Sequence, residues 1–324
     1  MDKYLVRLPA TERPLPPRAR GSRPTCVELF AGAGGMAVGL EAAGFEHVAM
    51  IERDRDCVHT LRQNGFGKCV KLKDARVVDY SRWRGADLVA GGPPCQPFSQ
   101  AGQNKGQDDS RDGWPVAIRA VSEIQPRAFV FENVIGMTRE RFSDYFESVL
   151  KRFWDLGYGV HVHLVDAADY GVPQHRRRVL MVGFRGAKWF PKPPATVAKH
   201  VTVGEMMKQL GPPTGKNGHE VRGKQPREYP AHVASTLDRP SRALTAGTHG
   251  PGGGNLTVKF GDGTLRYFTL RELACLQTFP LSYKLPAGWC KGFKQMGNAC
   301  PVKLAEAFGL AILRVLETTQ PESL

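Results

Sequence analysis

The sequence predicts an α/β fold: a doubly wound, mostly parallel sheet with helices on both faces, joined to a smaller, irregular, loop-rich domain. Three observations favour this fold. Short apolar strand-like runs alternate with helical patterns over residues 24–184, which is typical of consecutive βαβ units. A stretch rich in proline, glycine and basic residues follows over 185–266, and helical patterns return over 267–324. The 324 residues are enough to bury one large and one small core.

The first predicted unit is a strand, a glycine-rich turn, a helix and a second strand. Residues 25–30 are strand-like, the turn spans 31–35, a helix is expected over 36–43, and the next strand spans 47–52. The turn therefore lies at the carboxyl end of a strand, where parallel sheets commonly bind ligands.

The same alternation continues to residue 184 and resumes near the end of the chain. In the last helix, proline suits the first turn and the apolar residues share one face. The remaining predicted strands are 87–90, 128–131, 160–165 and 179–184, and the remaining predicted helices are 116–124, 143–156, 270–277 and 301–316.

Charge predicts a polyanionic partner. The net charge is +14, and nucleic acid is the leading candidate for a chain this basic. Residues 1–23 carry six basic residues, two acidic residues and four prolines without periodicity, so we expect a disordered basic arm. Residues 185–266 contain thirteen basic and five acidic residues and are expected to supply binding loops.

Composition also excludes several classes of protein. The seven cysteines include no Cys-x-x-Cys pair and no interleaved histidine ligand spacing, which argues against a disulfide framework and against a metal site. No run of eighteen apolar residues exists, and the N-terminus lacks the apolar core of a signal peptide. We therefore expect a cytoplasmic protein with no membrane partner.

The turn Phe30-Ala31-Gly32-Ala33-Gly34-Gly35 is a candidate cofactor loop. It lacks the full Gly-x-Gly-x-x-Gly spacing of a dinucleotide loop, which favours a nucleoside cofactor without a pyrophosphate, namely S-adenosylmethionine. Glu52, at the end of the second strand, suits ribose hydroxyls, and Asp74 suits an adenine amino group. Both acids could equally be surface residues at strand ends.

Cys95 follows two prolines in Gly91-Gly92-Pro93-Pro94-Cys95-Gln96-Pro97-Phe98-Ser99, directly after a predicted strand. A cysteine aimed by a stiff turn is a candidate nucleophile, although a small buried thiol is the plain alternative. Methyltransferases that act on exocyclic amines commonly carry Asp/Asn-Pro-Pro-aromatic at this strand end. Carbon 5 of cytosine instead becomes nucleophilic only after a thiolate adds to carbon 6, which would explain a cysteine here.

Glu132 and a basic triplet are the other candidate catalytic groups. Glu132 ends a buried strand, where burial would raise its pKa and suit it to act at ring nitrogen 3; an ordinary acid at a helix N-terminus is the alternative. In the run 174–178, strand alternation would turn Arg176 and Arg178 to one face and Arg177 to the other. A solvated basic triplet is the alternative there.

Taken in order, these motifs resemble the cytosine-C5 DNA methyltransferases of the bacterial modification-methylase type. The resemblance extends from about Thr25 to Leu316. The motifs are Phe-Ala-Gly-x-Gly-Gly at 30–35, Glu52, Asp74, Pro-Pro-Cys-Gln-Pro-Phe-Ser at 93–99, Glu-Asn-Val at 132–134, Gln-x-Arg-x-Arg at 174–178, Arg-Glu-Leu-x-x-Leu-Gln-x-Phe-Pro at 271–280, and Gln-x-Gly-Asn at 295–298.

The resemblance implies a class I S-adenosylmethionine-dependent, Rossmann-like methyltransferase fold. It implies that Cys95 is the nucleophile, that Glu132 contacts ring nitrogen 3 and the amino group, and that Arg178 contacts the base carbonyl with Arg176 in support. It also implies a target-recognition domain at 185–266 and a mobile loop at 100–112 that closes over a flipped base. The residues expected to line the S-adenosyl-L-methionine pocket are Phe30, Ala31, Gly32, Gly34, Gly35, Glu52, Arg53, Asp74, Pro94, Trp114, Asn298 and Ala299.

Double-stranded DNA is the expected partner of a monomeric, nucleoid-associated bacterial enzyme, and a cognate restriction endonuclease acting separately is a further candidate. Three alternatives stay open. A transfer-RNA methyltransferase of the same family would carry Cys-Phe-Thr, whereas this chain has only a misplaced Tyr267-Phe268-Thr269. A catalytically silent DNA-binding relative would have lost Cys95 or Glu132, and a Rossmann oxidoreductase is disfavoured by the glycine spacing. The target sequence cannot be read from the chain.

Overall fold

The computed structural model describes residues 22–94, 112–186, 189–223, 226, 234–246 and 256–318. Cys95 lies outside the described residues. So do residues 1–21 of the predicted arm and residues 100–111 of the predicted loop.

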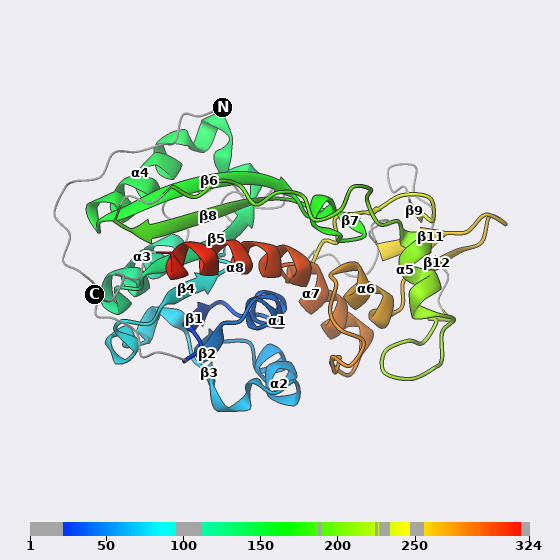
Figure 1. The fold of residues 1–324 in the computed structure, drawn as a ribbon. Coiled ribbons are helices and arrows are strands. Elements are labelled where there is room, and N and C mark those ends of the chain that lie inside the picture. Colours follow the sequence, from blue (N-terminus) through cyan, green and yellow to red (C-terminus); the bar gives the residue numbers. More distant parts are fainter. Residues whose placement is uncertain are drawn as a thin grey trace.

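A seven-stranded sheet forms the larger part of the molecule (Figure 1). Its strands, in spatial order, are β3 (Val70–Leu72), β2 (Glu46–Glu52), β1 (Thr25–Leu29), β4 (Leu88–Gly91), β5 (Ala128–Val134), β8 (Arg177–Arg185) and β6 (Tyr158–Asp166). Neighbouring strands are parallel except at β8, which runs antiparallel to both β5 and β6. The predicted mostly parallel sheet is confirmed.

Helices cover both faces of this sheet, which is therefore doubly wound. Strand β5 shows the cause, because Phe129 and Phe131 contact one core cluster while Ala128 and Val130 contact another, and all four are buried. Strands that are apolar on both sides are typical of parallel sheets with helices on each face. The first face is covered by α3 (Trp114–Ile124) and α4 (Ser143–Asp155), and the second by α1 (Gly35–Ala42) and α8 (Val302–Glu317), which lie side by side in Figure 1.

Three helices go beyond the elements expected from the sequence. They are α2 (Arg55–Gln63), α5 (Val203–Leu210) and α7 (Trp289–Asn298). Two of these helices begin at residues that commonly cap helices. The Asp54 side chain accepts hydrogen bonds from the first turn of α2, and Thr202 forms a capping box with Glu205 in α5. A helix of two or three turns has too few apolar positions to show a clear period.

A separate core forms around a small three-stranded sheet. That sheet has the order β12 (Leu265–Tyr267), β11 (Thr257–Lys259) and β9 (Ser235–Thr236), and it packs with α5 and α6 (Leu270–Leu276). A further short strand, β10 (Ser241–Arg242), pairs with β7 (Gln174–His175) and so ties this part to the main domain. Residues of α6 and α7 belong to the same core. This core therefore includes residues on both sides of the expected boundary between 185–266 and 267–324, and that boundary stays a prediction.

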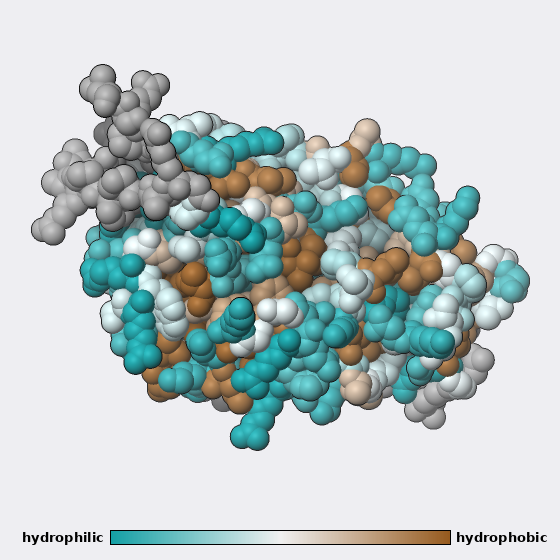
Figure 2. All heavy atoms as spheres, turned by 60° about the horizontal axis from the view of Figure 1, so that its bottom comes forward, coloured by the Kyte–Doolittle hydropathy of each residue, from teal (hydrophilic) through white to brown (hydrophobic). Residues whose placement is uncertain are grey.

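On the face drawn in Figure 2, apolar residues are interspersed among hydrophilic ones. Within the described ranges, no helix has the length and apolar character needed to cross a membrane. The same part of the chain contains no group of three or more His, Cys, Asp or Glu side chains arranged to hold a metal ion.

Candidate active site

Three predicted motifs meet at the carboxyl edge of the sheet, because they follow or end the adjacent strands β1, β4 and β5. In the ladders, Gly91 of β4 is level with Leu29 of β1 and Phe131 of β5. A Cβ atom at Gly91 would lie 2.3 Å from the carbonyl oxygen of Leu29, so glycine permits this close approach of the two strands. The cofactor loop, the double-proline turn and Glu132 are thereby brought to one place.

The cofactor loop is held by its backbone. The carboxylate of Glu52 accepts hydrogen bonds from the backbone N–H groups of Gly32 (2.8 Å) and Asp54 (2.7 Å). Phe30 and Gly34 both have positive φ angles, 56° and 78°, and Phe30 therefore occupies a conformation that non-glycine residues rarely adopt. Such strain at the end of a strand is typical of ligand sites.

The start of α1 packs directly on the end of α7. A Cβ atom at Gly35 would lie 2.1 Å from the carbonyl oxygen of Cys300 and 3.2 Å from the side chain of Ala299. This contact brings two predicted cofactor residues, the exposed Asn298 and the buried Ala299, next to the loop. Residues about 265 positions apart in the sequence thus form one wall of the candidate pocket.

Asp74 lies at the end of β3, one strand beyond Glu52. Its carboxylate is hydrogen-bonded by the side chain of Arg76 (Nη2 to Oδ2, 2.5 Å) and by the Arg76 backbone N–H (2.9 Å). These hydrogen bonds lower the pKa of Asp74 to about 2, so the group is an anion at neutral pH, and both of its oxygens accept from Arg76. The neighbouring Arg53 is exposed.

The double-proline turn is tied down at two points. The side-chain amide of the buried Asn133 donates to the carbonyl of Pro93 (3.2 Å), and the backbone N–H of Gly113 donates to the carbonyl of Pro94 (3.2 Å). Asp112, next to Gly113, accepts from the Trp114 backbone (3.0 Å) and from the hydroxyl of Tyr145. The residues on either side of 95–111 are therefore joined, and the approach to Cys95 is fixed.

Glu132 forms an ion pair with Arg178. The Nε atom of Arg178 lies 2.6 Å from Oε1 of Glu132, and only 14% and 11% of the two side chains are exposed. The pair follows from strand register: Glu132 is opposite Leu180 in the β5–β8 ladder, so Arg178 is its diagonal neighbour on the same face. The other carboxylate oxygen faces Gly92, being 3.6 Å from the position of a Cβ there, at the start of the Cys95 turn.

Arg176 is buried against two backbone carbonyls. Its guanidinium is buried and donates to the carbonyls of Leu244 and Gly297, each at 3.0 Å. It therefore joins the segment after β10 to α7, and the supporting role expected for Arg176 stays a prediction. The predicted alternation itself holds, since Arg177 is exposed while Arg176 is buried and Arg178 is partly buried.

Trp114 lies in the core behind the double-proline turn. Its side chain is fully buried and packs edge-to-face against Phe131 (5.8 Å between centroids) and Phe153 (6.4 Å). An indole buried in this aromatic cluster stabilises the core, and its expected place beside the cofactor stays a prediction. An aromatic residue at the start of a helix gives no sequence signal that separates these two roles.

Asn133, Gln174 and Gly113 hold segments of the candidate site in place, and sequence reasoning gave them no individual role. Gln174 accepts from the backbone N–H of Leu244 (2.9 Å) and donates to the carbonyl of Leu276 (3.0 Å). Leu244 is therefore held at its N–H by Gln174 and at its carbonyl by Arg176. Asn133 belongs to the motif 132–134 and Gln174 to the motif 174–178, so their place in a motif could have indicated a role. Gly113 belongs to no such motif.

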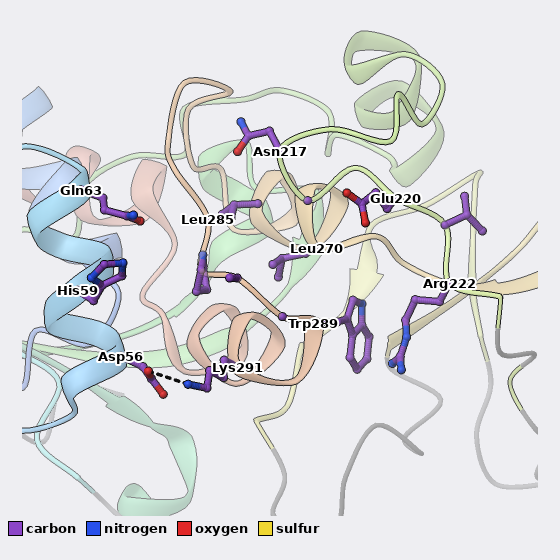
Figure 3. Close-up of a pocket in the computed structure, with 15 residues that line it drawn as sticks. Asp56, His59, Gln63, Asn217, Glu220, Arg222, Leu270, Leu285, Trp289 and Lys291 are labelled. Carbon is purple, nitrogen blue, oxygen red and sulfur yellow. Dashed lines mark hydrogen bonds and ion pairs between the residues drawn. The ribbon is translucent and has the colours of Figure 1, made fainter.

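A cavity of about 610 Å³ lies away from these residues. Figure 3 shows its lining, with His59 and Gln63 of α2 facing the loop around Leu285 and with Arg222 beside Trp289. The Arg222 guanidinium carbon is 4.2 Å from the centroid of the Trp289 ring. None of the predicted site residues lines this cavity, and we assign it no catalytic role.

A mostly parallel Rossmann-like sheet with a glycine-rich loop, a double-proline turn and a Glu–Arg pair at its carboxyl edge defines a class I methyltransferase site. The model of the family "C-5 cytosine-specific DNA methylase" matches residues 25–230 and 204–314. The chain belongs to this family: it is a DNA cytosine-C5 methyltransferase, and S-adenosylmethionine is its methyl donor. The predictions of family, activity and cofactor are confirmed.

The similar curated proteins are bacterial type II methyltransferases. The chain is 37% identical to M.NgoMIV of Neisseria gonorrhoeae, covering 90% of this chain and 98% of that protein. It is 34% identical to M.AplI of Arthrospira platensis, covering 90% and 86%. Among solved structures, a DNMT2 mutant of Spodoptera frugiperda matches with a TM-score of 0.70 at 18% identity, over 89% of this chain and 99% of that one; at this identity the match speaks for the fold alone.

Proposed function

We propose that this enzyme methylates carbon 5 of a cytosine that is flipped out of duplex DNA, through a covalent bond between Cys95 and carbon 6. The observation that carries the proposal is the Glu132–Arg178 pair, which lies beside the turn leading into Cys95. An acid and a cation next to a cysteine are the groups that covalent activation of a pyrimidine ring requires. Flipping the base costs a few kcal/mol, which contacts to the DNA must offset.

In the proposed reaction, the Cys95 thiolate forms a bond with carbon 6, and the electron pair of the 5,6 double bond moves into the ring. Glu132 stabilises the ring at nitrogen 3 and holds the exocyclic amino group. Carbon 5 would then form a bond to the methyl carbon as the bond from that carbon to the sulfonium sulfur of the donor breaks and releases a neutral thioether. A base that we assign to water removes the carbon-5 proton, and the bond to Cys95 breaks as the ring regains its double bond. Arg178 holds the Glu132 carboxylate and donates to the base carbonyl.

The pocket for the methyl donor is proposed between the cofactor loop and the end of α7. Glu52 presents its remaining lone pairs to ribose hydroxyls, and Asp74 accepts from the adenine amino group. Asn298 and Ala299 close the side next to Gly35. The backbone hydrogen bonds that hold Glu52, and the Arg76 contacts that hold Asp74, support this arrangement because both carboxylates are already oriented.

The nucleophile is tested by Cys95→Ala, with Cys290→Ala as a matched control at an exposed cysteine on α7. We expect Cys95→Ala to abolish methyl transfer while DNA and cofactor binding persist, and Cys290→Ala to remain active. DNA containing 5-fluorocytosine should form an adduct with the wild type that survives denaturation, because the carbon-5 position then has no proton to lose. Turnover of Cys95→Ala within tenfold of the wild type would exclude the covalent mechanism.

We further propose that residues 185–266 form the target-recognition domain and that double-stranded DNA is the substrate of a monomeric, nucleoid-associated enzyme. The net charge of +14 and the type II methyltransferase names of the relatives support this, and the same names support a separate cognate restriction endonuclease. Expression in a methylation-free bacterium followed by bisulfite sequencing should reveal methylcytosine in one sequence context. Labelled methyl uptake into transfer RNA instead of DNA would favour the alternative branch of the family.

A further inference from the structure

A tyrosine from a distant part of the chain lies beneath the cofactor loop. The hydroxyl of Tyr283 donates a hydrogen bond of 2.6 Å to the carbonyl of Ala33, in the middle of the loop. Both residues are buried, with 5% and 2% of their surfaces exposed. Burial raises the pKa of Tyr283, so the phenol stays protonated and is a permanent donor.

The loop is therefore anchored from two sides. Glu52 accepts from Gly32 N–H on one side, and Tyr283 donates to the Ala33 carbonyl on the other. Gly32 and Gly34 flank Ala33 with φ angles of 53° and 78°. Because glycine backbones reach many conformations at low cost, the loop depends on such external anchors to keep one of them.

Tyr283 is itself held rigidly. Its carbonyl accepts from Nη2 of the buried Arg271 (2.7 Å), and its ring packs on Phe279 at 4.7 Å between centroids. The next residue, Lys284, exchanges two hydrogen bonds with the side chain of Asn64 at the end of α2 (2.7 and 2.9 Å). A hydroxyl fixed this firmly can determine where the Ala33 carbonyl points.

We propose that Tyr283 is a positioning residue for S-adenosylmethionine, whose hydroxyl keeps the loop 30–35 in its binding conformation. The inference rests on the proposed assignment of this loop to the cofactor. When only a fraction of the molecules is competent to bind, the apparent dissociation constant rises as the inverse of that fraction. Removing the hydroxyl leaves the Ala33 carbonyl without its donor and lets the loop leave the competent conformation.

The test is Tyr283→Phe, which removes one oxygen atom. We expect the Kd for S-adenosylmethionine, measured by calorimetry, to rise about tenfold, as does the KM for the cofactor, while kcat at saturation stays within about twofold. A split of this kind distinguishes positioning of the cofactor loop from general destabilisation.

Tyr158→Phe is the matched control. The Tyr158 hydroxyl is also buried and also donates to a backbone carbonyl, that of Pro126 at 2.7 Å. Pro126 precedes β5, so this hydrogen bond lies at the amino edge of the sheet, opposite the site. Both variants should lose similar amounts of thermal stability, and only Tyr283→Phe should lose cofactor affinity. A Tyr283→Phe enzyme whose Kd stays within twofold of the wild type while its Tm falls like that of the control would overturn the proposal.

Two further variants keep the outcome decisive. If Tyr283→Phe does not fold, Asn64→Ala releases Lys284 without touching Tyr283; a threefold or larger rise in Kd supports the proposal, and an unchanged Kd overturns it. Glu52→Ala tests the loop assignment separately, because it removes the opposite anchor and the ribose acceptor. Normal binding by Glu52→Ala would defeat the assignment itself, whereas lost binding there with normal binding by Tyr283→Phe would defeat only the role of Tyr283.

Discussion

One of the two hydrogen bonds that hold the double-proline turn comes from a side-chain amide, and Asn133→Ala measures its contribution. The side chain of Asn133 is 3% exposed, donates to the carbonyl of Pro93 at 3.2 Å, and accepts from the backbone N–H of Val134 at 2.8 Å. Truncation leaves a carbonyl and an N–H without partners, each costing about 1–3 kcal/mol when water cannot reach it. Because Val134 is partly exposed, we expect a total loss of about 2–4 kcal/mol in the free energy of unfolding.

The rate should fall by more than stability explains. The turn delivers Cys95, and a misplacement of about 1 Å in a reacting group can cost roughly a hundredfold in rate. We expect single-turnover methyl transfer at saturating DNA and cofactor to fall about tenfold to a hundredfold, at a temperature where the variant is fully folded. Urea unfolding supplies the stability measurement, and Tyr158→Phe supplies a variant that is destabilised at the far edge of the sheet with its rate unchanged.

Asn133→Asp sharpens the test. It retains the acceptor for Val134 but turns an oxygen toward the Pro93 carbonyl and adds a negative charge beside Glu132. We expect this isosteric variant to be at least as slow as Asn133→Ala. Wild-type single-turnover rates in either variant would refute the reasoning that the amide positions the turn.

Four other perturbations have defined outcomes. Burial, followed by the charges of His161 and Lys192, lowers the pKa of His163 to about 4. Because the unfolded chain binds this proton more tightly, the free energy of unfolding should fall by about 1–3 kcal/mol from pH 6.5 to pH 4. In urea unfolding, His163→Phe should lose less stability than the wild type over the same pH range. Thr278→Ala should cost about 1 kcal/mol in thermal unfolding, since the Thr278 hydroxyl accepts from the Lys303 N–H at the start of α8 (3.0 Å), and an unchanged Tm would contradict that cap. Gly91→Ala should lose folded, active protein in expression trials, because its Cβ would lie 2.3 Å from a carbonyl oxygen. Affinity for nonspecific DNA, followed by fluorescence anisotropy, should fall linearly in log–log form with salt as counterions are released, and a flat dependence would argue against phosphate contacts.

Much of the main sheet could be predicted because its pattern is local. Apolar runs such as 128–131 are buried on both faces of the sheet. In the helices between them, apolar residues recur with the helical period, so each element carries its own signal. The antiparallel direction of β8 carried no such signal, since the direction of a strand depends on the path of the connection before it. Helix α5 was also not predicted, because its two turns contain only two buried side chains and so show no clear apolar period.

The site divides in the same way. Motif order predicted Glu52, Glu132 and Arg178 as members of one site. Glu52 and Glu132 each stand at the end of a predicted strand, and parallel strands bring those ends together. Arg178 stands at the start of β8 and reaches the same edge because β8 runs antiparallel to β5. The individual roles of Arg176 and Trp114 could not be read from their positions. A buried arginine that donates to two carbonyls and an arginine that faces a substrate have the same residue type and the same spacing.

The sequence by itself determined the fold class, the family and the activity, since apolar periods and short motifs are properties of neighbouring residues. Only the tertiary structure decided which distant side chains contact one another around the candidate site. The hydrogen bond from Tyr283 to Ala33 spans 250 positions, and the contact of Arg176 with Gly297 spans 121. Such contacts arise when separately formed elements pack against each other, and no local pattern encodes the partner that packing will supply.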